Sequence, residues 1–142
     1  MNVITGNILD ISEGVICHQV NCQRVAGAGL ALQIRCRWPD WYKRFLTVSR
    51  NLGEIWPFHA DYNLWIVSLY AQEYYGHDRQ YTDYSAMRRC FQTVRLLEVE
   101  HPGLPLCLPF GIGCGLGGGK WEIVSRIIED ELPHALLVKF GG

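Results

Sequence analysis

One stretch of the chain decides how we interpret the rest: Leu108-Pro109-Phe110-Gly111-Ile112-Gly113-Cys114-Gly115-Leu116-Gly117-Gly118-Gly119-Lys120-Trp121, which holds six of the 15 glycines. An apolar run before it predicts a buried strand over 104–109, and the apolar spacing after it predicts a helix over 120–132. A purely structural turn explains so many glycines poorly, because each one costs conformational entropy on folding. Backbone N–H groups that converge on an anion explain them better, so we favour a phosphate-binding loop over a flexible connector.

A second glycine-bearing loop joins another predicted strand to another predicted helix. It reads Val20-Asn21-Cys22-Gln23-Arg24-Val25-Ala26-Gly27-Ala28-Gly29-Leu30-Ala31. The free N–H groups at the start of the helix attract phosphate, and Gly27 and Gly29 let the backbone approach a ligand closely. Asn21, at the tip of the strand, offers both a donor and an acceptor. The alternative is a tight strand-to-helix turn with no ligand.

The apolar periodicity predicts ten elements in the order β, β, α, α, β, β, α, β, α, β. The strands are predicted at 3–5, 14–20, 53–60, 63–72, 104–109 and 135–140. The helices are predicted at 29–38, 39–50, from an N-cap at Thr82 to 100, and at 120–132. The last of these is predicted to bury Trp121, Ile123, Val124, Ile127 and Ile128. Such alternation predicts an α/β fold, a three-layer α/β/α sandwich with a central mixed six-stranded sheet. Both loops then lie at the carboxyl ends of strands, where ligands of such sheets bind.

Length and composition predict a single domain over residues 1–142. Because 13 basic residues balance 14 acidic ones, for a net charge of −1, bulk binding to duplex nucleic acid is disfavoured. We see no targeting or membrane segment, no metal motif and no need for a cofactor, and we expect a cytoplasmic monomer. We interpret the six cysteines as reduced, mostly buried thiols; they are Cys17, Cys22, Cys36, Cys90, Cys107 and Cys114.

Four segments together resemble the macro domains that bind ADP-ribose. They are Gly6-Asn7-Ile8, then His18-Gln19-Val20-Asn21 with Gly27-Ala28-Gly29-Leu30-Ala31, then 72–84 with Gly76, Arg79, Thr82 and Tyr84, and finally 108–121. The resemblance spans nearly the whole chain in the family's order. It is most similar to the branch of terminal ADP-ribose protein glycohydrolases and DNA-ADP-ribose hydrolases, whose loops carry Gly-x-Gly-Leu/Ile-Ala and Gly-Cys-Gly-Leu patterns.

The resemblance implies an ADP-ribose site. In it, Asn7 and Ile8 contact the adenine end, Asn21 and Leu30 lie by the distal ribose, and 111–117 wraps the diphosphate. Phe140 stacks on adenine, with a core position as its alternative. The full implied set is Asn7, Ile8, Asn21, Gly27, Ala28, Gly29, Leu30, Gln72, Gly111, Ile112, Gly113, Cys114, Gly115, Leu116, Gly117 and Phe140.

The chain departs from the family at positions that recognise the ligand or carry out catalysis. Asn7 replaces the usual acid, Gln72 stands where the hydrolase branch places a catalytic lysine, and Gly117 stands where it places an acid or a second glycine. The lysine–acid mechanism therefore does not carry over to this chain. We assign catalysis to Asn21 and to His77, the best general base by its ordinary pKa, with an exposed loop histidine as the alternative. His18, within a strand, is expected to make a core hydrogen bond.

Two functions of different classes follow. One is an enzyme that removes a group from the distal ribose of ADP-ribose, namely a phosphate (ADP-ribose 1''-phosphate), an acyl ester or a mono-ADP-ribosyl adduct. The other is a non-catalytic reader or sink for ADP-ribose. A general nucleotide or RNA-end binder is a third possibility. The expected partner is ADP-ribose or an ADP-ribosylated substrate.

Overall fold

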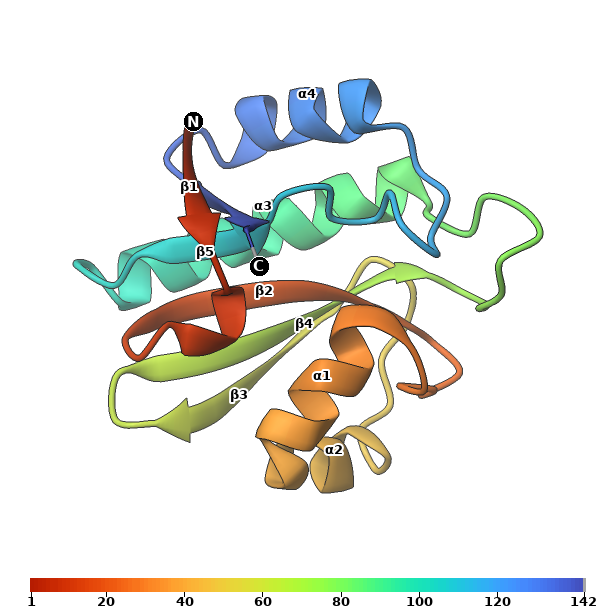
Figure 1. Cartoon of the computed structure of the whole chain (residues 1–142), viewed down its shortest axis with the longest axis horizontal. Helices are drawn as coiled ribbons and strands as arrows, with labels where there is room; N and C mark the ends of the chain where they lie inside the picture. The colour runs from red at the N-terminus through yellow and green to blue at the C-terminus, as the bar shows by residue number, and fades with distance from the viewer. Residues whose placement is uncertain (142) are drawn as a thin grey trace.

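The computed structural model describes residues 1–141, which form one mixed sheet with helices on both faces (Figure 1). The strands are β1 (Asn2–Gly6), β2 (Gly14–Asn21), β3 (Ile55–Asp61), β4 (Leu64–Gln72), β5 (Leu106–Pro109) and β6 (Leu136–Phe140). The sheet order is β1-β6-β5-β2-β4-β3, and only the edge strand β3 runs antiparallel to its neighbour. The predicted element order and the mixed six-stranded α/β fold are confirmed.

Two pairs of helices cover the two faces of the sheet (Figure 1). The helices are α1 (Gly29–Arg37), α2 (Pro39–Phe45), α3 (Tyr84–Glu100) and α4 (Trp121–Glu131), with a 3-10 turn, η1 (Ile8–Asp10), after β1. Because alternate residues of a strand face opposite sides, β2 sends Cys17 toward α3 and α4 and Ile16 toward α1 and α2. This alternation produces two separate hydrophobic clusters, one on each face.

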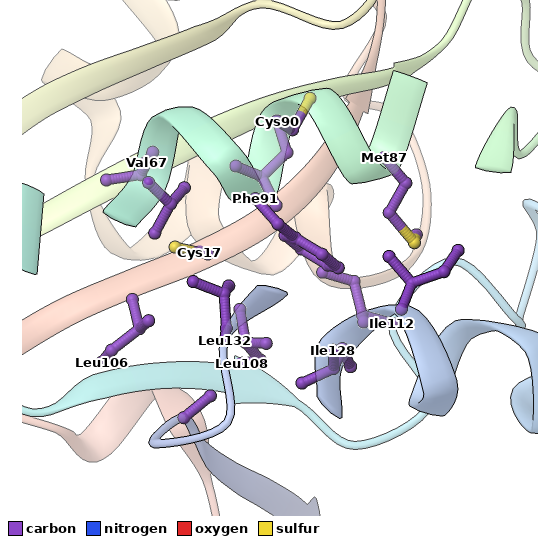
Figure 2. Packing of buried hydrophobic residues seen from close by; sticks show 14 of the residues in the cluster. Cys17, Val67, Met87, Cys90, Phe91, Leu106, Leu108, Ile112, Ile128 and Leu132 are labelled. Atoms are coloured by element: carbon purple, nitrogen blue, oxygen red, sulfur yellow. The ribbon is translucent and has the colours of Figure 1, made fainter. Parts of the chain in front are cut away.

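The cluster under α3 and α4 also anchors the glycine-rich stretch. Met87 and Phe91 of α3 pack with Ile128 of α4 against Leu108 of β5, and all four side chains are fully buried. Figure 2 shows Ile112 inserted among them beside Met87. Ile112 is therefore the apolar anchor that ties the following glycines to the core.

The cluster under α1 and α2 is aromatic. Trp41 stacks on Phe45 at a centroid distance of 4.6 Å, and Phe45 stacks in turn on Tyr70 of β4. Trp41 also donates its indole N–H to Ser68 Oγ, 3.1 Å away, so its polar atom is satisfied inside the core.

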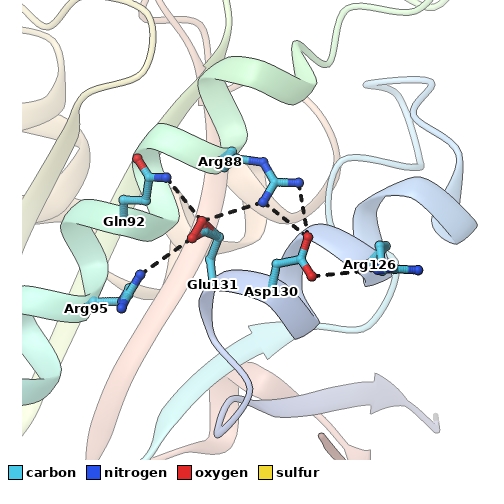
Figure 3. Close-up of polar contacts among 6 residues, drawn as sticks. All are labelled: Arg88, Gln92, Arg95, Arg126, Asp130 and Glu131. Atoms are coloured by element: carbon cyan, nitrogen blue, oxygen red, sulfur yellow. Dashed lines mark hydrogen bonds and ion pairs between the residues drawn. The ribbon is translucent and has the colours of Figure 1, made fainter.

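A network of ion pairs joins α3 to α4 on the outer side of the α3–α4 layer (Figure 3). The Glu131 carboxylate, only 9% exposed, accepts a hydrogen bond from Gln92 and lies 3.5 Å from Arg95 Nη1 and 3.6 Å from Arg88 Nη1. Arg88 also contacts Asp130 at 3.2 Å. The pairing explains why a glutamate is tolerated on the buried side of α4.

Three predicted boundaries or positions are wrong. The helix predicted over 39–50 ends at Phe45, because the backbone N–H and the hydroxyl of Thr47 both bond to the Arg44 carbonyl and close the last turn. The N-cap of α3 is Asp83, whose Oδ1 accepts from Ala86 N at 2.9 Å, and not the predicted Thr82. Ile123, predicted on the buried side of α4, is 38% exposed, because the buried positions of this helix begin at Val124.

The cysteines are all free thiols in the described chain, as expected, but fewer are buried than predicted. Cys17, Cys90 and Cys107 are buried, Cys22 and Cys114 are half-buried, and Cys36 is exposed. In the part of the chain that the structure describes, no helix is both long and apolar enough to cross a bilayer.

Candidate functional site

A cavity of about 580 Å³ opens at the carboxyl ends of three neighbouring strands. Asn21 ends β2, Gln72 ends β4 and Pro109 ends β5, and all three residues line it. Three loops form its walls: the first loop (22–28), the second loop (73–83) and the glycine loop (110–120). They lie together on the right of Figure 1. The two glycine-bearing stretches singled out in the sequence thus face each other across one cavity.

The glycine loop places unpaired backbone donors along this cavity. The N–H groups of Ile112, Cys114, Gly118 and Gly119 bond to carbonyls within the loop or just before it. Those of Gly113, Gly115, Leu116 and Gly117 have no acceptor among the described residues, and all four residues line the cavity. Successive free donors of this kind form a concave binding site for an anion.

The start of α1 supplies a second set of donors from the opposite wall. Gly29, Leu30 and Ala31 form its first turn and line the cavity, and no side chain caps them. The first N–H groups of a helix have no partner within it, and the helix dipole adds partial positive charge there. A Cβ built on Gly29 would lie 3.9 Å from Leu116, so the two walls nearly meet at this point.

A chain of three side chains ties the glycine loop to the sheet. Gln19 of β2 donates through Nε2 to both Thr82 Oγ1 and Gln72 Oε1, each at 2.8 Å. Thr82 in turn donates to the Gly113 carbonyl at 2.7 Å. A Cβ on Gly117 would lie 2.8 Å from the Gly113 oxygen and 3.0 Å from Gln19 Nε2, and it would collide with the Thr82 hydroxyl. Close packing against this chain therefore requires glycine at 117.

Gln72 and Asn21 are both held in place by their amides. Gln72 accepts from Gln19 and donates to the Tyr74 carbonyl at 2.7 Å. Asn21 donates to the Val25 carbonyl at 2.9 Å and accepts from Val25 N at 3.1 Å, so it brackets the first loop. Each amide keeps one N–H beyond these bonds. The structure thus gives both residues a task in shaping the cavity.

The cavity contains little ionisable chemistry. Its lining includes no Asp, Glu, Lys or Arg within residues 1–141. His77, on the second loop, is exposed and lines the mouth beside Tyr75. Burial, reinforced by Glu73, raises the pKa of the Cys22 thiol to about 11, and burial also raises the pKa of Cys114. These thiols are therefore protonated at neutral pH and are poor nucleophiles.

His18 also lines the cavity, but its side chain belongs to the aromatic core. It is 1% exposed, and its Nε2 lies 3.3 Å from the Ser68 hydroxyl, which confirms the expected core hydrogen bond. Because Ser68 Oγ accepts from Trp41, its own hydrogen is available to a neutral His18 ring. Loss of solvation lowers the pKa of His18 from 6.5 to about 3.

Most residues implied by the resemblance meet at the cavity. Those that line it are Asn21, Gly27, Ala28, Gly29, Leu30, Gln72, Gly111, Ile112, Gly113, Gly115, Leu116 and Gly117, and His77, which we assigned separately as a general base, lines it too. Four do not line it. Cys114 packs instead against the cluster under α3 and α4. Asn7, Ile8 and Phe140 lie beyond the cavity, where β1 and β6 end side by side. Phe140 is 73% exposed, so its alternative as a core residue is wrong.

Asn7 and Ile8 have structural tasks at that end. Asn7 caps the 3-10 turn η1 by accepting from Leu9 N at 2.9 Å, and the Ile8 side chain is buried in the aromatic cluster.

Several lining residues escaped the candidate list drawn from the sequence. They are His18, Gln19, Val20, Val25, Ala31, Tyr75, Gly76, Pro109 and Phe110. Gln19 carries a signal that was available: a polar residue two positions before the end of an otherwise buried strand needs a partner, and strand alternation puts it on the α3 face, where Thr82 lies. Tyr75 and Phe110 carry no such signal, because only the loop path brings them to the cavity.

No family model and no curated protein matches this chain. Solved structures do match. A protein of unknown function from Bacteroides thetaiotaomicron is 28% identical, with a TM-score of 0.78 over 98% of this chain and 96% of that one. The macrodomain of Mycobacterium tuberculosis DarG is 18% identical, with a TM-score of 0.80 over 98% and 95% of the two chains. Thermosipho africanus DarTG, solved in complex with ADP-ribose, is 18% identical, with a TM-score of 0.79 over 98% of this chain and 41% of its own. The chain therefore has the macrodomain fold.

The packing of Gly117 makes a stability prediction. Gly117→Ala should lower the free energy of unfolding by about 1–3 kcal/mol, because its methyl group collides with the Thr82–Gly113 contact. Gly115→Ala is the matched control: its Cβ meets no described atom within 4 Å, so the change should stay within about 0.5 kcal/mol. Urea unfolding measures both. Equal midpoints for the two variants would contradict the tight contact.

The buried His18 side chain predicts how the stability of the fold depends on pH. Its folded pKa of about 3 lies below its unfolded value of 6.5, so the unfolded chain binds the extra proton. The contribution of His18 to the free energy of unfolding is complete above pH 6.5. It falls by about 1.4 kcal/mol per pH unit as the pH drops toward 3. Urea unfolding at pH 7.5 and 5.0 should show a difference of about 2 kcal/mol that His18→Gln removes and the exposed control His59→Gln keeps. An unchanged difference in His18→Gln would refute this origin.

Proposed function

We propose that this protein binds ADP-ribose in the cavity and hydrolyses a group from its distal ribose. The observation that carries the proposal is the pair of facing donor sets, Gly113 to Gly117 on one wall and the first turn of α1 on the other, in a cavity whose described lining holds no carboxylate. These donors match a diphosphate in geometry and sign. The DarTG structure solved with ADP-ribose supports the same ligand class.

The order of the strands orients this ligand. Phe140 and Asn7 lie where β6 and β1 end, next to β5, while the cavity spans the ends of β5, β2 and β4. Adenine on the Phe140 side puts the diphosphate against the glycine loop and the distal ribose between Asn21 and Gln72. The group to be removed then faces Tyr75 and His77 of the second loop.

The reaction we propose uses water as the nucleophile. The water oxygen attacks the atom that carries the leaving group, a proton of the water passes to His77, and the leaving group departs with its bonding electrons and takes up a proton. Of the two histidines among the described lining residues, His77 is exposed and His18 is buried, and imidazole is the side chain most often used as a general base. Asn21, through its remaining N–H, and the loop donors polarise the reacting bond. The finer substrates are ADP-ribose 1''-phosphate, an acyl ester or a mono-ADP-ribosyl adduct.

The second candidate function is a reader or sink that binds ADP-ribose without turnover. The neutral lining favours it, because Gln72 is locked by Gln19 and Tyr74, and Gly117 has no side chain. Under either function we propose a single-domain, cytoplasmic monomer that needs no cofactor.

A single negative charge introduced into the glycine loop tests ligand binding. Gly115→Glu should weaken ADP-ribose binding at least about 100-fold in titration calorimetry, because its carboxylate repels the diphosphate among the loop donors. Gly115→Ala and Gly115→Gln, which add bulk without charge, should keep the affinity within about tenfold. Undiminished binding by Gly115→Glu would disprove the placement of the diphosphate. Binding of another nucleotide but not of ADP-ribose would reject both functions.

Turnover separates enzyme from reader. ADP-ribose 1''-phosphate, mono-ADP-ribosylated protein and a mono-ADP-ribosylated oligonucleotide are incubated with the protein, and the release of ADP-ribose or phosphate is followed. His77→Ala should lower the rate by about 100-fold or more while leaving ADP-ribose affinity within a few-fold, and Asn21→Ala should lower both. The distant His59→Ala serves as the control.

Each outcome of this panel is informative. A rate unchanged in His77→Ala excludes it as the base, and binding without turnover of any substrate identifies a reader.

A further inference from the structure

The corner of the sheet beyond the cavity carries an exposed aromatic ring next to a half-buried amide. Phe140, at the end of β6, is 73% exposed, and it pairs in register with Gly6, directly before Asn7. The cavity leads toward this corner, because Phe110 lines the cavity and donates its backbone N–H to the Val138 carbonyl of β6 at 2.9 Å. The corner therefore continues the cavity along the carboxyl edge of the sheet.

The spacing of the strands sets how far this corner lies from the glycine loop, which begins where β5 ends. The strand order there is β5-β6-β1. Because neighbouring strands lie about 4.8 Å apart, Phe140 lies about 5 Å and Asn7 about 10 Å sideways from the end of β5. A nucleoside whose diphosphate is held by the glycine loop spans this distance.

The Asn7 amide has one free side. Its Oδ1 accepts from Leu9 N at 2.9 Å, so the oxygen is used to cap η1. Turning the amide over would set its NH2 group against that N–H, a donor against a donor, so this hydrogen bond fixes the orientation of the amide. The Nδ2 atom makes no hydrogen bond to any described residue. It therefore offers its N–H groups to a ligand.

A carboxylate at this position would present the opposite group. It has two oxygens, so one could cap η1 while the other accepted a hydrogen bond from a ligand. In Asn7 an NH2 group takes the place of the second oxygen, so a ligand meets a donor instead of an acceptor. The direction of the hydrogen bond that this corner can make is thus reversed.

The two kinds of purine differ in the same way at their 6-position. Adenine carries an amino group there, which is a donor, whereas guanine carries an oxygen, which is an acceptor. Hypoxanthine carries the same oxygen as guanine. The N–H groups of Asn7 can pair with that oxygen, but they leave the adenine amino group without a partner.

We infer that Asn7 makes this corner select a 6-oxopurine over adenine. The inference rests on the proposed function, because it requires a nucleoside diphosphate ribose in the cavity with its base on Phe140. Adenine binds there by stacking alone, whereas hypoxanthine or guanine stacks and also accepts a hydrogen bond from Asn7. The preferred ligand class is then a 6-oxopurine nucleoside diphosphate ribose.

Titration calorimetry with ADP-ribose and inosine diphosphate ribose tests this inference, because the two ligands differ only at the amino or oxo edge of the base. The unchanged protein should bind the inosine ligand about three- to tenfold more tightly, as expected for one hydrogen bond. Asn7→Asp keeps an oxygen to cap η1 and gains one that accepts from the 6-amino group. It should reverse the preference to about tenfold in favour of ADP-ribose.

Two further variants serve as controls. Asp10→Asn, the converse exchange at an exposed position of the same 3-10 turn, should change the ratio of the two affinities by less than about twofold, because solvent screens its charge. Phe140→Ala should weaken both ligands about tenfold through the lost stacking, and it should leave their ratio unchanged.

The outcomes separate this inference from the proposed function. Binding of both ligands with no preference for the inosine ligand, or with a ratio that Asn7→Asp leaves unchanged, overturns the inference and leaves the proposed function standing. The same holds if Phe140→Ala weakens neither ligand, because the base would then lie elsewhere. Failure of both ligands to bind rejects the proposed function, and the inference with it.

Discussion

The hydrogen bond from Thr82 to the Gly113 carbonyl is the contact on which the candidate site depends. It joins the end of the second loop to the glycine loop, and Gln19 extends it to β2 and to Gln72. A loop with six glycines has little conformational preference of its own, so its shape must be imposed by partners. Thr82 imposes it from the polar side, and Ile112 imposes it from the core (Figure 2). These two anchors therefore fix the positions of the backbone donors of Gly115 to Gly117.

This construction accounts for a site without charged side chains. A lysine or arginine side chain in the cavity would attract any anion, and it would lose side-chain conformational entropy when it became ordered. Backbone donors held by Thr82 and by the first turn of α1 are already ordered, so they select an anion by shape. Most of the basic residues lie instead on the surfaces of the α1–α2 layer and in the α3–α4 ion-pair network.

The fold could be predicted well because its evidence is local. Each strand and helix has its own apolar period, and the alternation of elements then leaves few ways to arrange the sheet. The errors arose where side chains at element ends compete for backbone groups. Thr82 is a good cap by type, but its hydroxyl is used by Gly113, so Asp83 caps α3. Thr47 ends α2 early by bonding to Arg44, which no periodicity reveals.

The sequence by itself determined the element order, the two glycine-bearing loops and the polar strand ends Asn21 and Gln72, because these depend on residue type and spacing along the chain. Only the tertiary structure decided which loops share a cavity, that Phe140 stands exposed beside Gly6 beyond it, and that Gln19 locks Gln72. It also decided that Arg37, Lys43 and Arg44 border one groove with residues of β3. The physical reason is that β2 pairs with β4 and β5, and β1 with β6, through residues 50 or more positions apart, and such contacts leave no periodic trace in the chain.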